Sequence, residues 1–280
     1  MKYILTCLVL GFLIASCDTS GVKKNDKVVS KIEPTSKDSN ILDGEYTVID
    51  QKKFSNGIKI EWFEKGTGAN VATGDLVMID FKVKLKDGKV VDGNHLIHRT
   101  AIPFLVGFGM QTEGWDIALK ELKVGDFAKI LIPSPLARGE KGIEGLIPRN
   151  ADNFLIIRII ENKKPTRVVA GTKVWLLEEN THNKLKFNEK CKMEFHAMAS
   201  TSTTAMFVNT YRNNQPFQYK LTDHGLVPGL RNALINAKKS DRMFILVPSS
   251  EAYGTAGYLD FVKPGEDVFY NVLVMDVSKI

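Results

Sequence analysis

Apolar and polar residues alternate along several short segments of this chain, a pattern typical of half-buried β-strands. From Leu76 to Leu85 the residues Val77, Ile79, Phe81 and Val83 fall on one face. Further strands are predicted at residues 57–62, 127–132 and 154–160, and then at 172–177, 192–199, 243–247 and 268–277. Asp87-Gly88 is a hairpin turn signal that indicates antiparallel pairing with the residues after it. The pattern therefore predicts antiparallel sheets.

Helical spacing occurs in two short places. Trp115, Ala118, Leu119 and Leu122 stand at positions i, i+3, i+4 and i+7 of one predicted helix, and a second helix is predicted near residues 229–237. Several strands with one short helix make an α+β domain, in which the helix packs across a curved sheet and buries both apolar faces. The sequence predicts this arrangement twice.

The two predicted domains are copies of one pattern. Residues 114–154 and 229–269, compared at a constant offset of 115, share 14 identities in 41 positions without a gap. A period this long indicates duplicated domains rather than a solenoid, whose repeats span about 20–50 residues. We place the first domain at residues 52–163 and the second at 166–280.

Composition adds limits to this picture. The chain has 280 residues, with 44% hydrophobic and 25% charged residues, as in ordinary globular proteins. The net charge is 38 − 32 = +6, and the lysines are scattered, which favours a solvated surface over a nucleic-acid-binding face. The five histidines are interpreted as loop residues, and no cluster indicates a metal site or a cofactor.

The N-terminus predicts export. Lys2 precedes an apolar run that is too short to span a bilayer but fits a signal peptide, here residues 1–16. The segment from Leu13 to Cys17 resembles a bacterial lipobox, which implies cleavage before Cys17 and a lipid on its sulfur; an ordinary signal peptide is the alternative. We expect a lipid-anchored protein of the cell envelope, on the outer membrane and facing the periplasm.

The segment after the anchor is polar. Residues 17–51 contain only short apolar pairs and are predicted to be a flexible tether between lipid and folded body. Cys7 would be lost with the signal peptide. Cys191 lies in an alternating segment, so we expect it to be a buried small hydrophobe.

Both copies also carry short motifs in a fixed order. The first copy contains Gly114-Trp115-Asp116, Val124-Gly125-Asp126, Ile132-Pro133 and Ala137-Arg138-Gly139. The second contains Gly225-Leu226-Val227-Pro228-Gly229, Val247-Pro248 and Ala252-Tyr253-Gly254. In order and spacing the chain resembles the FKBP family of peptidyl-prolyl cis-trans isomerases, over nearly all of its folded body.

The resemblance implies a half-barrel of antiparallel strands over one helix, with an aromatic-walled pocket between them. In the second copy the implied catalytic positions are Tyr253, Phe217, Val227, Leu230, Phe195, Phe207, Tyr258, Phe261, Val262 and Tyr270. In the first copy the implied substrate-binding positions are Phe81, Asp92, Phe104, Trp115, Leu146, Ile147 and Leu155. The implied reaction needs no cofactor and no metal.

Each copy departs from the family pattern. The first keeps the tryptophan floor Trp115, but Arg138 replaces the tyrosine donor, and we expect it to be weak or inactive. The second keeps Tyr253 and the aromatic walls, but its floor is Leu230 and its acidic position is Val208.

Two functions follow from this division. The first is a foldase that isomerises X–Pro bonds of unfolded or exported proteins. The alternative is a non-catalytic lipoprotein that binds clients or an envelope assembly.

Overall fold

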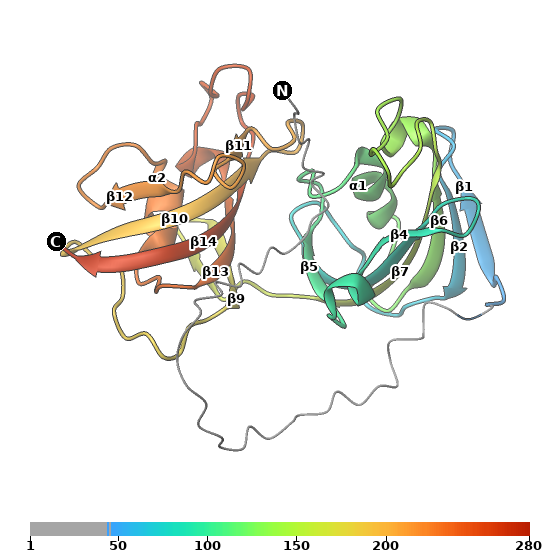
Figure 1. Ribbon diagram of the computed structural model, residues 1–280, viewed down its shortest axis with the longest axis horizontal. Coiled ribbons are helices and arrows are strands. Elements are labelled where there is room, and N and C mark those ends of the chain that lie inside the picture. Colours follow the sequence, from blue (N-terminus) through green and yellow to red (C-terminus); the bar gives the residue numbers. More distant parts are fainter. Residues whose placement is uncertain (1–43, 45) are drawn as a thin grey trace, which may run out of the picture. The chain divides into compact units, whose positions relative to one another are not determined.

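The computed structural model describes residue 44 and residues 46–280, and Figure 1 shows their course. The predicted signal peptide and Cys17 lie outside the described residues. No helix in the described part of the chain is long and apolar enough to cross a membrane.

The first sheet has seven strands, and the helix α1 lies between its fifth and sixth strands in sequence. The strands are β1 (Asp50–Lys53), β2 (Lys59–Glu64), β3 (Leu76–Lys84), β4 (Val90–Gly93), β5 (Ile102–Leu105), β6 (Phe127–Ile132) and β7 (Asn153–Asn162), with α1 at Glu113–Leu119. Short 3₁₀ turns lie at Asn94–Ile97 and Ser134–Leu136. The strand order is β1-β2-β6-β7-β3-β4, and β5 pairs with β3.

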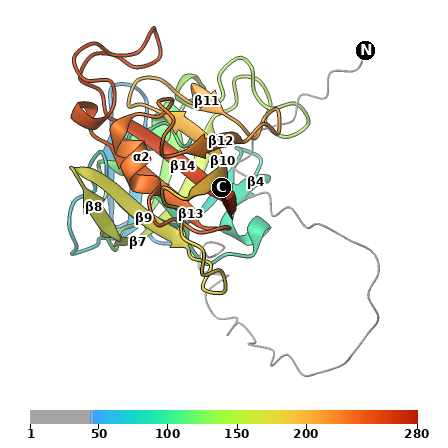
Figure 2. The same cartoon turned by 90° about the vertical axis from the view of Figure 1, so that its left-hand side faces the viewer.

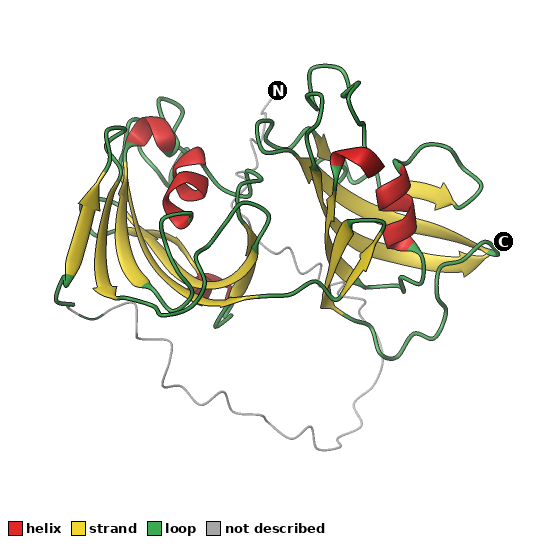
Figure 3. Ribbon diagram, turned by 180° about the vertical axis from the view of Figure 1, so that it is seen from behind, coloured by secondary structure: helices red, strands yellow, loops and turns green. Residues whose placement is uncertain are grey.

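The second sheet repeats this topology. Its strands are β8 (Arg167–Val169), β9 (Thr172–Glu178), β10 (Cys191–Ser200), β11 (Val208–Asn209), β12 (Phe217–Lys220), β13 (Arg242–Val247) and β14 (Val268–Lys279), with α2 at Pro228–Leu234 and a 3₁₀ turn at Ser249–Glu251. The order is β8-β9-β13-β14-β10-β11, and β12 pairs with β10. Long antiparallel strands with short helices recur in Figure 3, and the α+β fold predicted from the sequence is confirmed.

The second copy shows how its helix and sheet share one core. Leu230, Ala233 and Leu234 of α2 are buried against the inward-facing residues Met243 and Ile245 of β13. Figure 2 shows α2 across this sheet. Cys191 belongs to the same core and is buried, as its alternating segment predicted.

Both helices are shorter than the apolar spacing predicted. After α1 the chain makes a 3₁₀-type turn, in which the Leu122 amide donates to the Leu119 carbonyl, three residues back, at 3.1 Å. After α2 the chain turns at Asn236, whose φ is +68°, a left-handed conformation that ends helices. The apolar positions were identified correctly, but periodicity does not report where the backbone leaves the helix.

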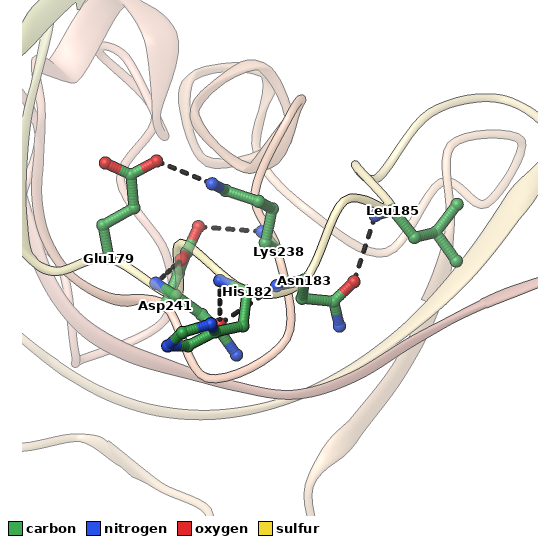
Figure 4. A network of polar contacts seen from close by, with 7 residues as sticks. Glu179, His182, Asn183, Leu185, Lys238 and Asp241 are labelled. Atoms are coloured by element: carbon green, nitrogen blue, oxygen red, sulfur yellow. Dashed lines mark hydrogen bonds and ion pairs between the residues drawn. The ribbon is translucent and has the colours of Figure 1, made fainter.

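A polar network fastens the chain around the end of α2 (Figure 4). Asp241 accepts hydrogen bonds from the backbone amides of Asn180 and Lys238 at 3.0 and 2.8 Å. The Lys238 ammonium pairs with Glu179 at 2.6 Å, and Asn183 accepts from the Leu185 amide at 3.0 Å. The Asn180–Asp241 and Glu179–Lys238 contacts hold the long connection between β9 and β10 against the turn that precedes β13.

Ordered structure begins earlier than the predicted tether allowed. β1 starts at Asp50, and Tyr46 packs its ring on Phe63 and Phe127, with ring centroids 5.0 and 4.7 Å apart. A single aromatic residue in a polar segment gave no periodic signal, although it covers an apolar surface of the sheet.

The described chain divides by its internal contacts into two compact units. One contains residues up to 65 together with 79–102 and 126–158, and the other contains 66–78, 103–125 and 159–280. The second unit therefore joins α1 and its flanking segments to the whole second copy. The domain limits at residues 52–163 and 166–280 stay predictions.

The glycine-rich loops after β6 and β13 have the same hydrogen bonds at the constant offset. Ser134 and Ser249 accept through their carbonyls from the amides of Gly139 and Gly254, both at 2.8 Å. Gly257, with φ +68°, lies so close to the Val262 carbonyl that a Cβ atom would be 2.4 Å from it. Gly254 has φ +57°, but a Cβ atom added there would have no other atom within 4 Å.

These two glycines form a matched pair for a stability test. We expect Gly254→Ala to lower the free energy of unfolding by about 1 kcal/mol, the cost of a left-handed alanine. Gly257→Ala adds a backbone clash, and we expect a loss of roughly 3 kcal/mol. Urea unfolding of the full-length chain measures both, and equal losses would contradict the packing of this loop.

Candidate functional site

The second copy gathers its predicted site residues at the edge of its core. Phe195, Leu230, Val262 and Tyr270 are buried in that core, and Phe207, Val227 and Tyr253 pack against it. The three other predicted residues, Phe217, Tyr258 and Phe261, are 38–44% exposed. Buried residues thus form a base, and exposed aromatic rings surround it.

Seven aromatic residues at these positions make up what we call the second-copy aromatic cluster: Phe195, Phe207, Phe217, Tyr253, Tyr258, Phe261 and Tyr270. Ring contacts join them in two sets, and Tyr270 joins through Tyr253. Phe195 on β10 lies opposite Phe217 on β12, with ring centroids 5.3 Å apart. Tyr253 stacks on Tyr258 at 4.8 Å. Phe261 contacts Tyr258 at 6.4 Å and stacks on Phe207 at 5.9 Å.

Two polar groups lie among these rings. The hydroxyl groups of Tyr253 and Tyr270 share a hydrogen bond, and burial raises the pKa of both tyrosines. The interaction with Tyr270 lowers the pKa of Tyr253, whereas the interaction with Tyr253 raises the pKa of Tyr270. A tyrosine hydroxyl can both donate and accept a hydrogen bond, so Tyr253 can offer its proton to a ligand oxygen.

Val227 supplies a second donor. It is the residue before α2, with φ −60° and ψ 148°, and it is half-buried. Within the described residues, no backbone or side-chain acceptor receives a hydrogen bond from its amide. The first amides of a helix have no partner inside the helix, so this N–H can bind a carbonyl oxygen.

The first-copy residues fall in both compact units. In the second unit, Phe104 and Trp115 are buried and stacked, with centroids 5.6 Å apart. In the first unit, Phe81, Ile147 and Leu155 are buried and Leu146 is half-buried. The Leu146 carbonyl accepts a hydrogen bond from the Lys89 ammonium at 3.2 Å.

Asp92 of the first copy is a half-buried carboxylate. Burial raises its pKa, while the hydrogen bond from the Gly93 amide, 2.8 Å long, and the charges of Arg138 and His95 act in the opposite direction. Arg138 stands where the second copy has Tyr253. A permanent charge therefore replaces the neutral hydroxyl donor, which opposes removal of water from an amide.

One histidine differs from the sequence interpretation. His196 was expected in a loop but lies in β10, where it is 4% exposed and stacks on Tyr211 at 4.5 Å. Burial lowers its pKa. Among the described residues, no group of histidine, cysteine and acidic side chains is placed to hold a metal ion.

The buried tyrosine pair predicts a stability change at high pH. Unfolded tyrosine ionises near pH 10, whereas folded Tyr270 has a raised pKa and keeps its proton. Above pH 10 the unfolded state binds fewer protons, so unfolding becomes more favourable as pH rises. We expect the wild type to lose up to about 1.4 kcal/mol per pH unit more than Tyr270→Phe above pH 10.

Urea midpoints at pH 9, 10 and 11 measure this difference. Below pH 10 the two proteins should differ by a constant amount. Parallel curves through pH 11 would show that Tyr270 ionises normally and is not shielded in the folded protein.

Comparisons with known proteins agree with the repeated topology. The profile of the family described as FKBP-type peptidyl-prolyl cis-trans isomerase matches residues 67–160 and 183–275. FK506-binding protein 4 of Rhizopus delemar is 35% identical over 111 residues, which are 40% of this chain and 28% of that protein. Peptidyl-prolyl cis-trans isomerase FKBP10 of Homo sapiens is 24% identical over 209 residues, or 74% of this chain and 35% of that protein.

A solved structure of the three FKBP domains of wheat FKBP73 covers 81% of this chain and 97% of its own, with 22% identity and a TM-score of 0.40. The chain spans about a third of the length of the curated relatives named above. Because the two profile matches together cover more than half of the sequence, this chain belongs to the FKBP-type peptidyl-prolyl cis-trans isomerase family, with two domains of that family.

Proposed function

We propose that this chain is a peptidyl-prolyl cis-trans isomerase and that its second copy carries the activity. The observation that supports this most is the second-copy aromatic cluster with two donors beside it, the Tyr253 hydroxyl and the Val227 amide. Its substrates are X–Pro bonds in unfolded or exported proteins.

An apolar aromatic surface with hydrogen-bond donors suits rotation about an X–Pro bond. Rotation about an X–Pro bond breaks amide resonance and crosses a barrier of about 18–20 kcal/mol. The twisted amide is less dipolar than the planar one, so an apolar, water-poor surface stabilises the transition state relative to the ground state. Tyr253 and Val227 would hold substrate carbonyl groups while the bond turns. No nucleophile is required.

A binding protein without activity is the second candidate. It is favoured by the floor of the second copy, where Leu230 stands in place of the tryptophan found in the first copy, and by Val208 at the acidic position. The same aromatic rings could hold a proline-containing segment of an envelope partner without accelerating its rotation.

Removing the Tyr253 hydroxyl separates these candidates. One net hydrogen bond contributes about 0.5–1.5 kcal/mol, so Tyr253→Phe should lower kcat/KM by roughly 3–10-fold. The assay is protease-coupled isomerisation of short X–Pro peptides by the full-length chain. Tyr211→Phe is the control, because Tyr211 is a half-buried tyrosine that stacks on His196, apart from the cluster.

Lack of acceleration by the wild-type chain would overturn the isomerase proposal. Binding of a fluorescent proline peptide, measured by anisotropy on the same preparation, would then support the binding alternative.

We also propose that the protein is a bacterial lipoprotein anchored through Cys17 to the outer membrane. The support is the sequence from Leu13 to Cys17 and the polar segment that follows it. Two acyl chains give stable anchoring, whereas one gives only marginal binding. A tethered foldase would meet exported chains where slow X–Pro isomerisation delays folding.

Cys17→Ser tests the anchor. In bacteria that express the full-length chain, we expect wild-type protein in the membrane fraction, with incorporation of labelled palmitate. Cys17→Ser should lose the label, whereas Cys7→Ser should keep it, because Cys7 would be removed with the signal peptide. Labelling of Cys17→Ser, or none of the wild type, would contradict the lipoprotein proposal.

A further inference from the structure

The second sheet is apolar on both faces. On β13, Met243, Ile245 and Val247 belong to the core beneath α2, whereas Phe244 and Leu246 belong to a separate cluster on the other face. That cluster, which we call the outer cluster, contains Leu76, Leu105, Phe108, Trp175, Phe244, Leu246 and Phe269. Segments of the first copy thus cover the outer face of the second sheet, within one compact unit.

Phe108 lies on a short loop that hydrogen bonds hold in place beside this cluster. Gly107 and Gly109 flank it with φ of +86° and +64°. Their amides donate to the two carboxylate oxygens of Asp116 on α1, at 2.7 and 2.9 Å. Phe108 itself is 3% exposed. We call residues 107–109 the Phe108 loop.

The loop has two attachments on the second sheet. The Ser200 hydroxyl donates to the Phe108 carbonyl at 2.6 Å, and the rings of Phe108 and Phe269 form a T-shaped pair with centroids 6.3 Å apart. Ser200 and Phe269 are themselves partners across β10 and β14. Both attachments therefore fall on a single cross-strand pair.

The next pair along these strands belongs to the candidate site. Ala199 lies opposite Tyr270, one residue further on each strand. Successive side chains of a strand point to opposite faces, so Phe269 enters the outer cluster while Tyr270 enters the core and bonds to Tyr253. A shift of β14 at Phe269 would move the Tyr270 hydroxyl.

We propose that Phe108 is a positioning residue for the second-copy site, which it serves by fixing Phe269 and with it the hydroxyl pair of Tyr270 and Tyr253. This inference rests on the proposed function for its catalytic meaning, but not for its structural part. One copy of the duplication then sets the geometry of the site in the other.

The test uses Phe108→Ala in the full-length chain, below its unfolding temperature. We expect kcat/KM to fall by about 3–10-fold, the effect of one misplaced hydrogen bond. In a Tyr253→Phe background the same substitution should have little further effect, because the group that it misplaces is absent. Phe187→Ala is the matched control: it removes an equally buried ring that packs on Tyr219, and it should leave kcat/KM of the folded protein unchanged.

A second readout does not depend on activity. The NMR signals of the Cζ carbons of Tyr253 and Tyr270 should shift in Phe108→Ala and stay in place in Phe187→Ala. If Phe108→Ala does not fold, kcat/KM and the tyrosine Cζ signals are measured in Phe108→Leu and Ser200→Ala instead, with the same expected changes. Unmoved tyrosine signals, or an equal loss of activity with and without Tyr253, would overturn the proposal. An inactive wild type with shifted tyrosine signals would overturn only the isomerase function.

Discussion

A β-sheet that is apolar on both faces must be covered on both, and much of the second compact unit follows from this constraint. Helix α2 covers one face of the second sheet, and Leu76, Leu105 and Phe108 of the first copy contribute to the cover of the other. Each large apolar side chain buried there contributes about 1.5–3 kcal/mol relative to exposure. The contacts of the chain therefore join residues 66–78 and 103–125 to the second copy, across the limit that the repeat suggests.

The candidate site depends on the core between α2 and the second sheet. Its base consists of core residues such as Leu230 and Val262, which would be buried in any domain of this fold. Its particular chemistry comes from the exposed rings Phe217, Tyr258 and Phe261 and from the hydroxyl of Tyr253. The first copy builds the same loop with Ile143, Leu146 and Arg138 at the corresponding positions, so the scaffold is shared and the surface chemistry is not.

The repeat and the alternating segments were sufficient to predict the α+β fold and the long strands. The ten second-copy site residues came from the family resemblance instead, and their role stays a prediction. Short edge strands such as β11 and β12 were missed, because two to four residues carry no period. The outer cluster was missed although a signal existed: residues 243–247 are apolar without interruption, which indicates a strand buried on both faces. The matching strand of the first copy has Lys129 where the second has Phe244. Periodicity can show that a face is apolar, but it cannot name the distant segment that covers it.

The direction of protein synthesis gives the outer cluster a further meaning. Leu76, Leu105 and Phe108 leave the ribosome before Trp175, Phe244 and Phe269 are made. The hydrophobic surface of the later copy thus emerges when its partner residues already exist in the same chain. Exposed apolar strands are the surfaces through which folding intermediates aggregate. A chain with its two copies in the reverse order would have to expose that surface while the ribosome completed its cover.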